Sequence, residues 1–273
     1  MPELPEVETT RRGITPHILG HQIHNIEIRE RRMRWPVEDD VLKLVGKTIN
    51  SIERRAKYLL IGCDTGTLML HLGMSGSLRI CPHEIELRKH DHFIMRIDGG
   101  MELRLHDPRR FGAVLWHDKN EGPLDQHPLL HHLGPEPLED DFHSDYLTTS
   151  CKGRKISIKQ LVMNNKIVVG AGNIYACEAL FRSGIRPTRP AGKISKTRLV
   201  KLTQEIKDVL AEAIEQGGTT LRDFLREDGK PGYFKQKLHV YDRENEPCHL
   251  CDAIIKRIVI SNRSTFYCPR CQR

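Results

Sequence analysis

The residues after the initiator methionine, PELPE, place a proline and a carboxylate side by side at the start of the chain. Because an initiator methionine that precedes proline is usually removed, we expect the mature chain to begin with the secondary amine of Pro2. Such an amine can attack a sugar carbon, and the resulting iminium keeps its positive charge because the nitrogen has no N–H to lose. Glu3 could then act as a general acid as the bond breaks. Ordinary helix entry explains the same residues, with Pro5 at a first helical position and Glu6 and Glu8 in the first turn.

Four of the eight cysteines lie close together near the end of the sequence, in the pattern Cys-x2-Cys-x16-Cys-x2-Cys. Paired thiolates at this spacing form two knuckles that complete a tetrahedral zinc site, and four thiolates leave no open position for catalysis. We therefore predict one structural Zn²⁺ held by Cys248, Cys251, Cys268 and Cys271. We expect reduced thiols without a role at the scattered cysteines, because disulfides are rare in the cytosol; these are Cys63, Cys81, Cys151 and Cys177.

A basic cluster at Arg54, Arg55 and Lys57 lies in a strand-like run that continues to residue 61. The period of two places Arg55 and Lys57 on one face of a strand, where they could bind phosphates. A solvated sheet edge protected by lysine explains these residues equally well.

Two loop sequences, HLGMSG at residues 71–76 and DPRRFG at residues 107–112, each follow a strand-like segment. An enzyme that flips a base out of a duplex must fill the hole and hold the orphaned partner. Met74 and Phe111 are apolar wedges of the kind that enter base steps, and the Arg109 guanidinium could hydrogen-bond the edge of the partner base. Taken alone, a methionine and a phenylalanine are more often core residues.

A glycine-rich turn, VGAGN at residues 169–173, opens a helix. A helix N-terminus behind such a turn can bind a phosphate, although a tight turn between two helices has the same sequence. Arg154, Lys155 and Lys159 form a basic cluster of the sort that contacts a nucleic acid backbone. Three further histidines, His127, His131 and His132, are expected to lie in a solvated loop.

Composition limits the class of protein. A chain of 273 residues suggests two domains, or one with an appendage. Its net charge of +7 fits a polyanionic partner, nucleic acid before membrane. No apolar run approaches the ~20 residues of a membrane span, and the N-terminus lacks the apolar core of a signal peptide, so we expect a cytoplasmic protein.

The loops at residues 71–76 and 107–112 each follow a segment with the pattern of a β-strand. After a short helix over residues 7–12, residues 68–74 alternate in polarity, and residues 93–97 and 101–105 do the same around a turn at residues 98–100. Paired short strands of this kind predict a β-sandwich in the first half of the chain.

The second half has helical periodicity. A proline-, glycine- and acid-rich break at residues 133–141 indicates a linker, and residues 199–214 form an amphipathic helix with Ser195 as N-cap and Gly217 as C′ residue. Residues 217–234 are predicted to be a mobile loop that could act as a lid. Residues 237–241 and 254–260 are strand-like around the cysteine cluster.

The start MPELPEVETTRRG resembles that of the formamidopyrimidine-DNA glycosylases, bacterial enzymes that excise oxidised purines and then nick the strand. The strings RRAKYL, HLGMSG, DPRRFG and GNIYACEALF match that family in the same order, so the resemblance covers nearly the whole chain. The related endonuclease VIII branch carries a glycine in place of Leu4 and lacks the trio Met74, Arg109 and Phe111.

The resemblance implies an α+β fold with an N-terminal catalytic β-sandwich flanked by helices at residues 1–132 and a linker at 133–146. A helical domain with a helix–two-turn–helix element follows at 147–236, and a zinc finger at 237–273. It also implies a monomer that acts in the bacterial cytoplasm at the nucleoid.

The implied activity is base-excision repair of duplex DNA that contains oxidised bases or abasic sites. The enzyme would remove 8-oxoguanine and formamidopyrimidines and cleave the abasic site by β,δ-elimination through a Schiff base on the N-terminal proline. The resemblance assigns catalytic roles to Pro2, Glu3, Glu6, Lys57 and Arg263. It assigns DNA contacts to His71, Met74, His90, Arg109, Phe111, Arg154, Asn173 and Tyr241. Arg222 stands where relatives carry lysine and receives no role.

Two rival functions remain open at this point. One is an endonuclease VIII-like glycosylase for oxidised pyrimidines, which Leu4 and the trio Met74, Arg109 and Phe111 disfavour. The other is a non-catalytic zinc-ribbon DNA-binding protein, which the presence of Pro2, Glu3 and Lys57 disfavours.

Overall fold

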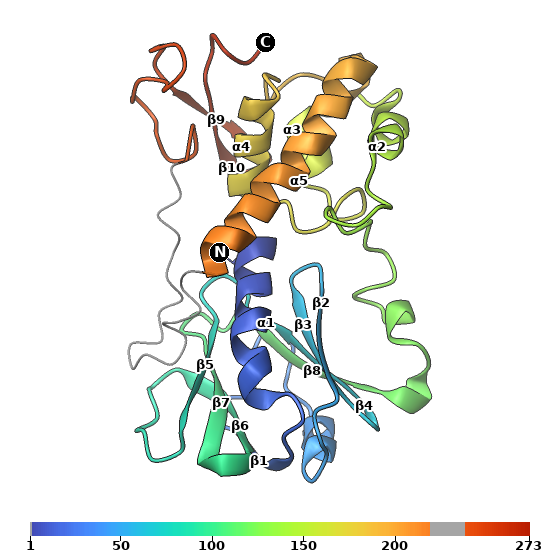
Figure 1. Ribbon diagram of the computed structural model, residues 1–273, viewed down its shortest axis with the longest axis vertical. Helices are drawn as coiled ribbons and strands as arrows, with labels where there is room; N and C mark the ends of the chain where they lie inside the picture. Colours follow the sequence, from blue (N-terminus) through green and yellow to red (C-terminus); the bar gives the residue numbers. More distant parts are fainter. Residues whose placement is uncertain (1, 219–237) are drawn as a thin grey trace. The chain divides into compact units, whose positions relative to one another are not determined.

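The computed structural model describes residues 2–218 and 238–273 (Figure 1). The chain folds into two compact units, one built mainly from residues 2–131 and the other from residues 132–213 and 238–273. They are called here the N-terminal unit and the C-terminal unit. The predicted lid at residues 217–234, the residue Arg222 and the start of the predicted strand at residue 237 lie wholly or largely outside the described residues.

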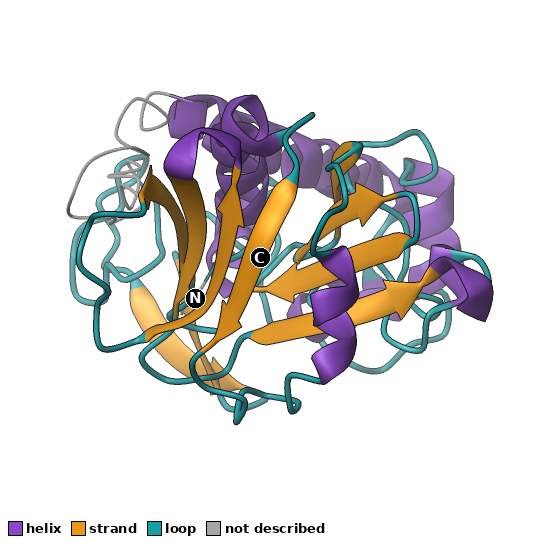
Figure 2. Cartoon of the chain, turned by 90° about the horizontal axis from the view of Figure 1, so that it is seen from below, coloured by secondary structure: helices purple, strands orange, loops and turns teal. Residues whose placement is uncertain are grey.

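Two antiparallel four-stranded sheets make up the N-terminal unit (Figure 2). One sheet has the strand order β1 (Ile23–Ile28), β6 (Asp91–Ile97), β7 (Met101–His106) and β5 (Ser77–Pro82). The other has the order β2 (Ser51–Arg55), β3 (Tyr58–Cys63), β4 (Gly66–His71) and β8 (Ala113–Asp118). The predicted β-sandwich is confirmed.

Apolar side chains from both sheets meet in one core. Leu59 and Leu70 from one sheet and Phe93 and Leu105 from the other are almost fully buried in the same cluster. The predicted hairpin of β6 and β7 is confirmed, and its turn, Asp98–Gly100, contains two glycines with φ of +70°. The strand predicted for residues 68–74 ends earlier, at His71, because the next residues turn away from the sheet.

Helix α1 (Leu4–Ile18) is longer than the predicted helix over residues 7–12. It continues through Gly13 and Pro16, residues that usually weaken a helix. Ile14 and Ile18 on its inner face are fully buried in the sandwich core, and this burial stabilises the last turns. Short 3-10 helices complete this unit: η1 (Asp39–Leu44), η2 (Asp98–Gly100), η3 (Lys119–Glu121) and η4 (Leu124–Gln126).

The single strand predicted around Lys57 is wrong. Residues 51–63 form a hairpin in which β2 and β3 are joined by a two-residue turn, with Arg55 paired to Tyr58. Ala56, the first turn residue, has φ of +53°. Lys57 therefore lies at the tip of a hairpin rather than on the face of a strand.

The C-terminal unit is helical with an added hairpin. Its helices are α2 (Ser144–Cys151), α3 (Ile158–Val162), α4 (Asn173–Arg182), η5 (Ala191–Lys193) and most of α5 (Lys196–Gly218). Ser195 directly precedes α5 as predicted, whereas the helix is described through Gly218, so Gly217 is helical and not the C′ residue. Strands β9 (Lys256–Ile260) and β10 (Arg263–Tyr267) pair with each other.

The strand predicted at residues 237–241 is wrong over its described part, because residues 238–241 form bends and turns. The backbone N–H groups of His239, Val240 and Tyr241 all donate to the buried carboxylate of Glu178, at 2.8–3.0 Å, instead of to a neighbouring strand. Within the described parts of the chain, every helix is too short or too polar to cross a membrane.

Candidate functional site

The start of helix α1 fixes the two carboxylates that follow Pro2. Glu3 is the N-cap residue, and it forms a capping box with Glu6, whose Oε2 accepts the Glu3 backbone N–H at 2.8 Å. The Glu3 side chain is buried and Pro2 is half-buried. The helix-entry interpretation is therefore correct in outline, although Leu4 is the first helical residue, Pro5 is the second, and Glu6 but not Glu8 lies in the first turn.

The hairpin tip with Lys57 lies beside His71. The neighbouring residue Tyr58 pairs with His71 across β3 and β4, and their ring centroids are 4.9 Å apart. His71 Nδ1 accepts the backbone N–H of Gly73 at 2.9 Å, so the neutral ring carries its proton on Nε2. Burial lowers the pKa of His71 to about 4, helped by the positive charges of Arg34 and Lys57. At neutral pH, His71 is an uncharged donor.

This depressed pKa makes stability depend on pH. An unfolded histidine titrates near pH 6.5, so between pH 4 and 6.5 the unfolded chain binds more protons than the folded one. Above pH 6.5, the folded protein has the full stability that a neutral His71 allows. As the pH falls from 6.5 to 4, this part of the stability is lost. From pH 7 to pH 5, we expect wild type to lose on the order of 1–2 kcal/mol more stability than His71→Gln, measured by urea unfolding. The exposed His131, changed to Gln, is the control; equal pH dependence of all three proteins would contradict the prediction.

Met74, Arg109 and Phe111 lie together on two adjoining loops. Met74 and Phe111 are 40% and 44% exposed, which is unusual for large apolar side chains, and the Arg109 guanidinium lies 4.7 Å from the Phe111 ring centroid. A side chain at Gly73, which has φ of +61°, would overlap the backbone of residues 111 and 112. The alternative interpretation, in which Met74 and Phe111 are buried core residues, is therefore wrong, because the two loops expose both side chains to solvent.

Asp107 ties the two loops together, and sequence reasoning missed it. Its buried carboxylate accepts the Ser75 hydroxyl at 2.8 Å from one loop and the Gly112 N–H at 2.8 Å from its own loop. Its backbone N–H donates to the His90 carbonyl at 2.9 Å. The Asp-Pro pair, a common start of a turn, was the available signal. His90, half-buried, thus lies next to the loop of Arg109.

In the C-terminal unit, the side chain of Asn173 at the start of α4 is held by two partners. Its Oδ1 accepts from Lys159 Nζ at 2.5 Å, and its Nδ2 donates to the Ser264 carbonyl at 2.9 Å. The amide has a second N–H, which a phosphate oxygen could accept. The prediction that Lys159 contacts nucleic acid is wrong, because Lys159 is 1% exposed and also donates to Thr265 Oγ1 at 2.6 Å.

Lys159 therefore joins α3, α4 and β10. Replacing it with methionine should leave the acceptors on the half-buried Asn173 and the buried Thr265 without this donor and cost about 2–4 kcal/mol of unfolding free energy. The exposed neighbour Lys155, changed to methionine, should change stability by less than about 0.5 kcal/mol. Chemical denaturation compares the two variants, and similar losses in both would argue against a structural role for Lys159.

The β9–β10 hairpin presents Arg263 at its tip. The turn residues Ser261 and Asn262 have φ of +48° and +59°, as a tight hairpin turn requires, and Arg263 is exposed at the start of β10. The Tyr241 ring packs edge-on against Phe266 of β10, with centroids 5.1 Å apart. Arg154 is exposed at the end of the turn after α2.

Burial opposes ionisation of Glu178, but hydrogen bonds from the His239 side chain and three backbone N–H groups lower its pKa. This carboxylate of α4 thereby fixes the segment that carries Tyr241. Arg154, Asn173, Tyr241 and Arg263 thus lie in the C-terminal unit, and the other predicted active-site residues lie in the N-terminal unit.

The four clustered cysteines form the predicted metal site. Their sulfur atoms lie within 4.8 Å of one another, with Sγ–Sγ distances that include 3.5 Å and 3.9 Å. Zn–S bonds of about 2.3 Å in a tetrahedron place the sulfurs about 3.8 Å apart, so the cysteines fit one structural Zn²⁺. Among residues 2–218 and 238–273, this is the one group of His, Cys, Asp or Glu side chains placed to hold a metal ion, and His127, His131 and His132 are outside it.

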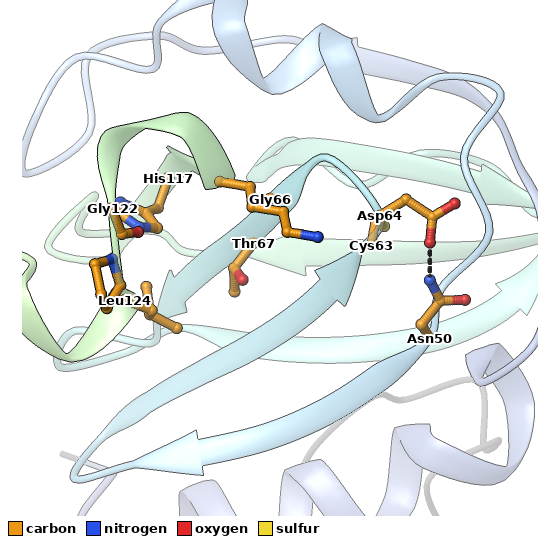
Figure 3. Close-up of a pocket in the computed structure, with 10 residues that line it drawn as sticks. Asn50, Cys63, Asp64, Gly66, Thr67, His117, Gly122 and Leu124 are labelled. Atoms are coloured by element: carbon orange, nitrogen blue, oxygen red, sulfur yellow. Dashed lines mark hydrogen bonds between the residues drawn. The ribbon is translucent and has the colours of Figure 1, made fainter.

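A hollow of about 380 Å³ in the N-terminal unit lies away from these loops (Figure 3). Gly66 and His117 line it, whereas His71 and Ala113 pair at the opposite ends of the same two strands, β4 and β8. A strand of six residues spans about 17 Å, so the hollow is separate from the site. Burial raises the pKa of Cys63, which also lines the hollow, to about 11, so this thiol is not a nucleophile at neutral pH.

Three stretches of the sequence match known domain families. Residues 1–114 match the formamidopyrimidine-DNA glycosylase N-terminal domain, and residues 133–225 match the formamidopyrimidine-DNA glycosylase H2TH domain. Residues 245–273 match the zinc finger found in FPG and IleRS.

Individual relatives match over the full length. The chain is 58% identical over 274 residues to a formamidopyrimidine-DNA glycosylase of Thioalkalivibrio sulfidiphilus, with 100% of both proteins covered. Its fold is similar to that of Lactococcus lactis Fpg in complex with an abasic site containing DNA, with a TM-score of 0.90, 32% identity and 100% of both chains covered. It is also similar to MutM in complex with carbocyclic 8-oxo-G containing DNA, with a TM-score of 0.89, 33% identity and the same coverage.

Proposed function

Because the chain belongs to the formamidopyrimidine-DNA glycosylase family, we propose that it excises oxidised purines from duplex DNA and cleaves the resulting abasic site in base-excision repair. The observation that carries this proposal is the buried, capped Glu3 directly beside Pro2 at the start of α1. Relatives solved with abasic-site DNA and with 8-oxo-G DNA support the substrate class.

The first half of the reaction breaks the bond between sugar and base. Once Met1 is removed, the Pro2 nitrogen attacks C1′ of the flipped nucleoside and the bond between C1′ and the base breaks. The base leaves with the bonding electron pair and takes up the proton that the Pro2 nitrogen loses. Glu3 protonates the ring oxygen and opens the sugar, which leaves an iminium on Pro2. Glu6 orients the start of the helix by accepting the Glu3 N–H.

The second half breaks the strand. The iminium acidifies the C2′ proton, whose loss expels the 3′ phosphate, and a second elimination expels the 5′ phosphate, so that a one-nucleotide gap remains. Lys57 assists the first elimination. The Arg263 guanidinium, with a pKa above about 12, is a poor proton donor, so its role is to stabilise the charge of the leaving phosphate.

The remaining site residues bind the duplex. Met74, Arg109 and Phe111 fill the space that the flipped nucleotide vacates, and their exposure on adjoining loops supports this role. Asn173 and Tyr241 contact phosphates of the DNA, and further DNA contacts come from His71, His90 and Arg154. His71 donates as a neutral imidazole, because burial keeps its pKa near 4.

We also infer the domain limits as an N-terminal catalytic domain at 1–132, a linker at 133–146, a helical domain at 147–236 and a zinc finger at 237–273. The end of the first compact unit at residue 131 supports the boundary near residue 132, and the separate family match at residues 245–273 supports a distinct zinc finger. Since its substrate is damaged DNA, we place the enzyme at the nucleoid in the bacterial cytoplasm, acting as a monomer.

The alternatives have less support. An oxidised-pyrimidine specificity is disfavoured by the exposed Met74, Arg109 and Phe111 and by Leu4. A non-catalytic DNA-binding protein is disfavoured because Pro2, Glu3 and Lys57 are all present in the chain.

The test uses purified protein and duplexes that carry 8-oxoguanine, thymine glycol, an abasic site or no lesion. We expect release of 8-oxoguanine and nicking at the abasic site, with slow action on thymine glycol. Affinity should fall steeply between 50 and 200 mM salt, by about 10³-fold if six or more phosphates are contacted. Preference for thymine glycol would favour the pyrimidine alternative, and salt-sensitive binding without nicking would favour the non-catalytic one.

A further inference from the structure

A bridge of charged side chains joins helix α1 to the hairpin that carries Lys57. Arg54 of β2 donates through Nε to Glu8 Oε2 of α1 at 3.1 Å. The same guanidinium donates through Nη1 to the carbonyl oxygen of Ala56 at 3.0 Å. One side chain therefore links a carboxylate of the helix to the peptide group between Ala56 and Lys57.

The bridge lies in a protected environment. The side chains of Glu8 and Arg54 are 10% and 11% exposed. Arg11 and Arg12 also bind Glu8, at 2.8 Å and 2.9 Å, from the helix itself. Burial opposes ionisation of Glu8, but hydrogen bonds from Arg11 and Arg12 outweigh it and lower the pKa of Glu8 to about 2, so this carboxylate is charged at any pH near neutrality.

The turn that the bridge holds is conformationally demanding. Ala56 has φ of +53° and is 4% exposed, and a residue with a Cβ rarely adopts this left-handed region. A planar guanidinium can bond a carboxylate and a carbonyl at once in a fixed geometry, whereas a lysine at the same place cannot reproduce that fork. The identity of Arg54, and not only its charge, therefore matters for the turn.

We propose that the Glu8–Arg54 pair is a positioning device, which holds the Ala56–Lys57 peptide so that Lys57 reaches the sugar bound to Pro2 during β-elimination. Glu8 lies on the same helix as Glu3 and Glu6, two residues after Glu6. The bridge therefore sets Lys57 relative to the helix that carries the nucleophile. This inference rests on the proposed function, because it needs Pro2 and Lys57 to act in the same reaction.

The experiment measures two steps separately under single-turnover conditions. Borohydride trapping on duplex with a preformed abasic site reports iminium formation, and strand cleavage of the same duplex reports β-elimination. Arg54→Lys keeps the charge and should slow cleavage by about tenfold to a hundredfold while trapping changes less than about threefold. Glu8→Gln, a second variant that retains the side-chain shape, should act in the same direction.

Arg12→Met is the matched control, because Arg12 binds the same carboxylate but is 46% exposed on the helix surface. It should leave both steps within about twofold of wild type. The decisive measurement is a double-mutant cycle with Lys57→Met. If Arg54 acts through Lys57, then Arg54→Lys should add little further loss of cleavage in the Lys57→Met background.

The outcomes separate the two proposals. An inactive wild type would overturn the proposed function and this inference with it. If the wild type is active, two results would overturn the positioning role alone. One is an equal loss of trapping and cleavage in Arg54→Lys, and the other is a full additional loss when Arg54→Lys is combined with Lys57→Met. A fall in the thermal midpoint of Arg54→Lys with unchanged cleavage in the folded protein would likewise mean that the bridge only stabilises the fold.

Discussion

Borohydride should trap a covalent complex between the mature protein and a duplex that contains 8-oxoguanine, and a chain that retains residues before Pro2 should not form it. A peptide bond removes the nucleophilic lone pair of the proline nitrogen, so trapping and base release should each fall by at least about 10³-fold. Pro2 directly precedes Glu3, the N-cap residue of α1. Mass spectrometry of the first peptide shows which form is present.

The matched control is a chain with a removable N-terminal extension. Before cleavage it should bind a duplex with a stable abasic-site analogue but form no adduct, and after cleavage it should recover wild-type trapping. Pro2→Gly supplies a primary amine in place of the secondary one and should trap less. Wild-type trapping by the uncleaved extended chain would remove Pro2 from the mechanism.

Much of the N-terminal unit could be predicted because its sequence alternates. The β6–β7 hairpin follows from apolar residues at period two around the Asp98–Gly100 turn. The turn at residues 56 and 57 was missed because Ala56 and Lys57 are not typical turn residues. The hydrogen bond from Arg54 to the Ala56 carbonyl oxygen stabilises this turn, which glycine or asparagine would otherwise favour by their own conformational preference.

Long-range polar contacts account for the other errors. Lys159 looked like a surface cation, and only its partners Asn173 and Thr265, distant in sequence, show that it is buried. Asp107 bonds Ser75 across 32 positions, which no local pattern reports. The metal site was predictable because its four ligands come as two local pairs with a fixed spacing.

Glu3→Gln should lose base excision but retain cleavage at an abasic site, and this difference separates acid catalysis from a structural role. Glutamine cannot protonate the ring oxygen, so release of 8-oxoguanine should fall by about 10²–10⁴-fold. An abasic sugar exists partly as the open aldehyde, which Pro2 can attack without that protonation. Cleavage of preformed abasic sites should therefore stay within about tenfold of wild type.

Glu3→Gln is suited to this test because glutamine can preserve the capping box at the start of α1. Its side-chain oxygen can still accept the Glu6 N–H of the capping box, and the Glu3 backbone N–H still donates to Glu6. The thermal midpoint should consequently change little, whereas Glu3→Ala should lower it by removing the cap. Equal losses in both reactions would assign Glu3 to positioning of Pro2, and undiminished base excision would exclude it as the acid.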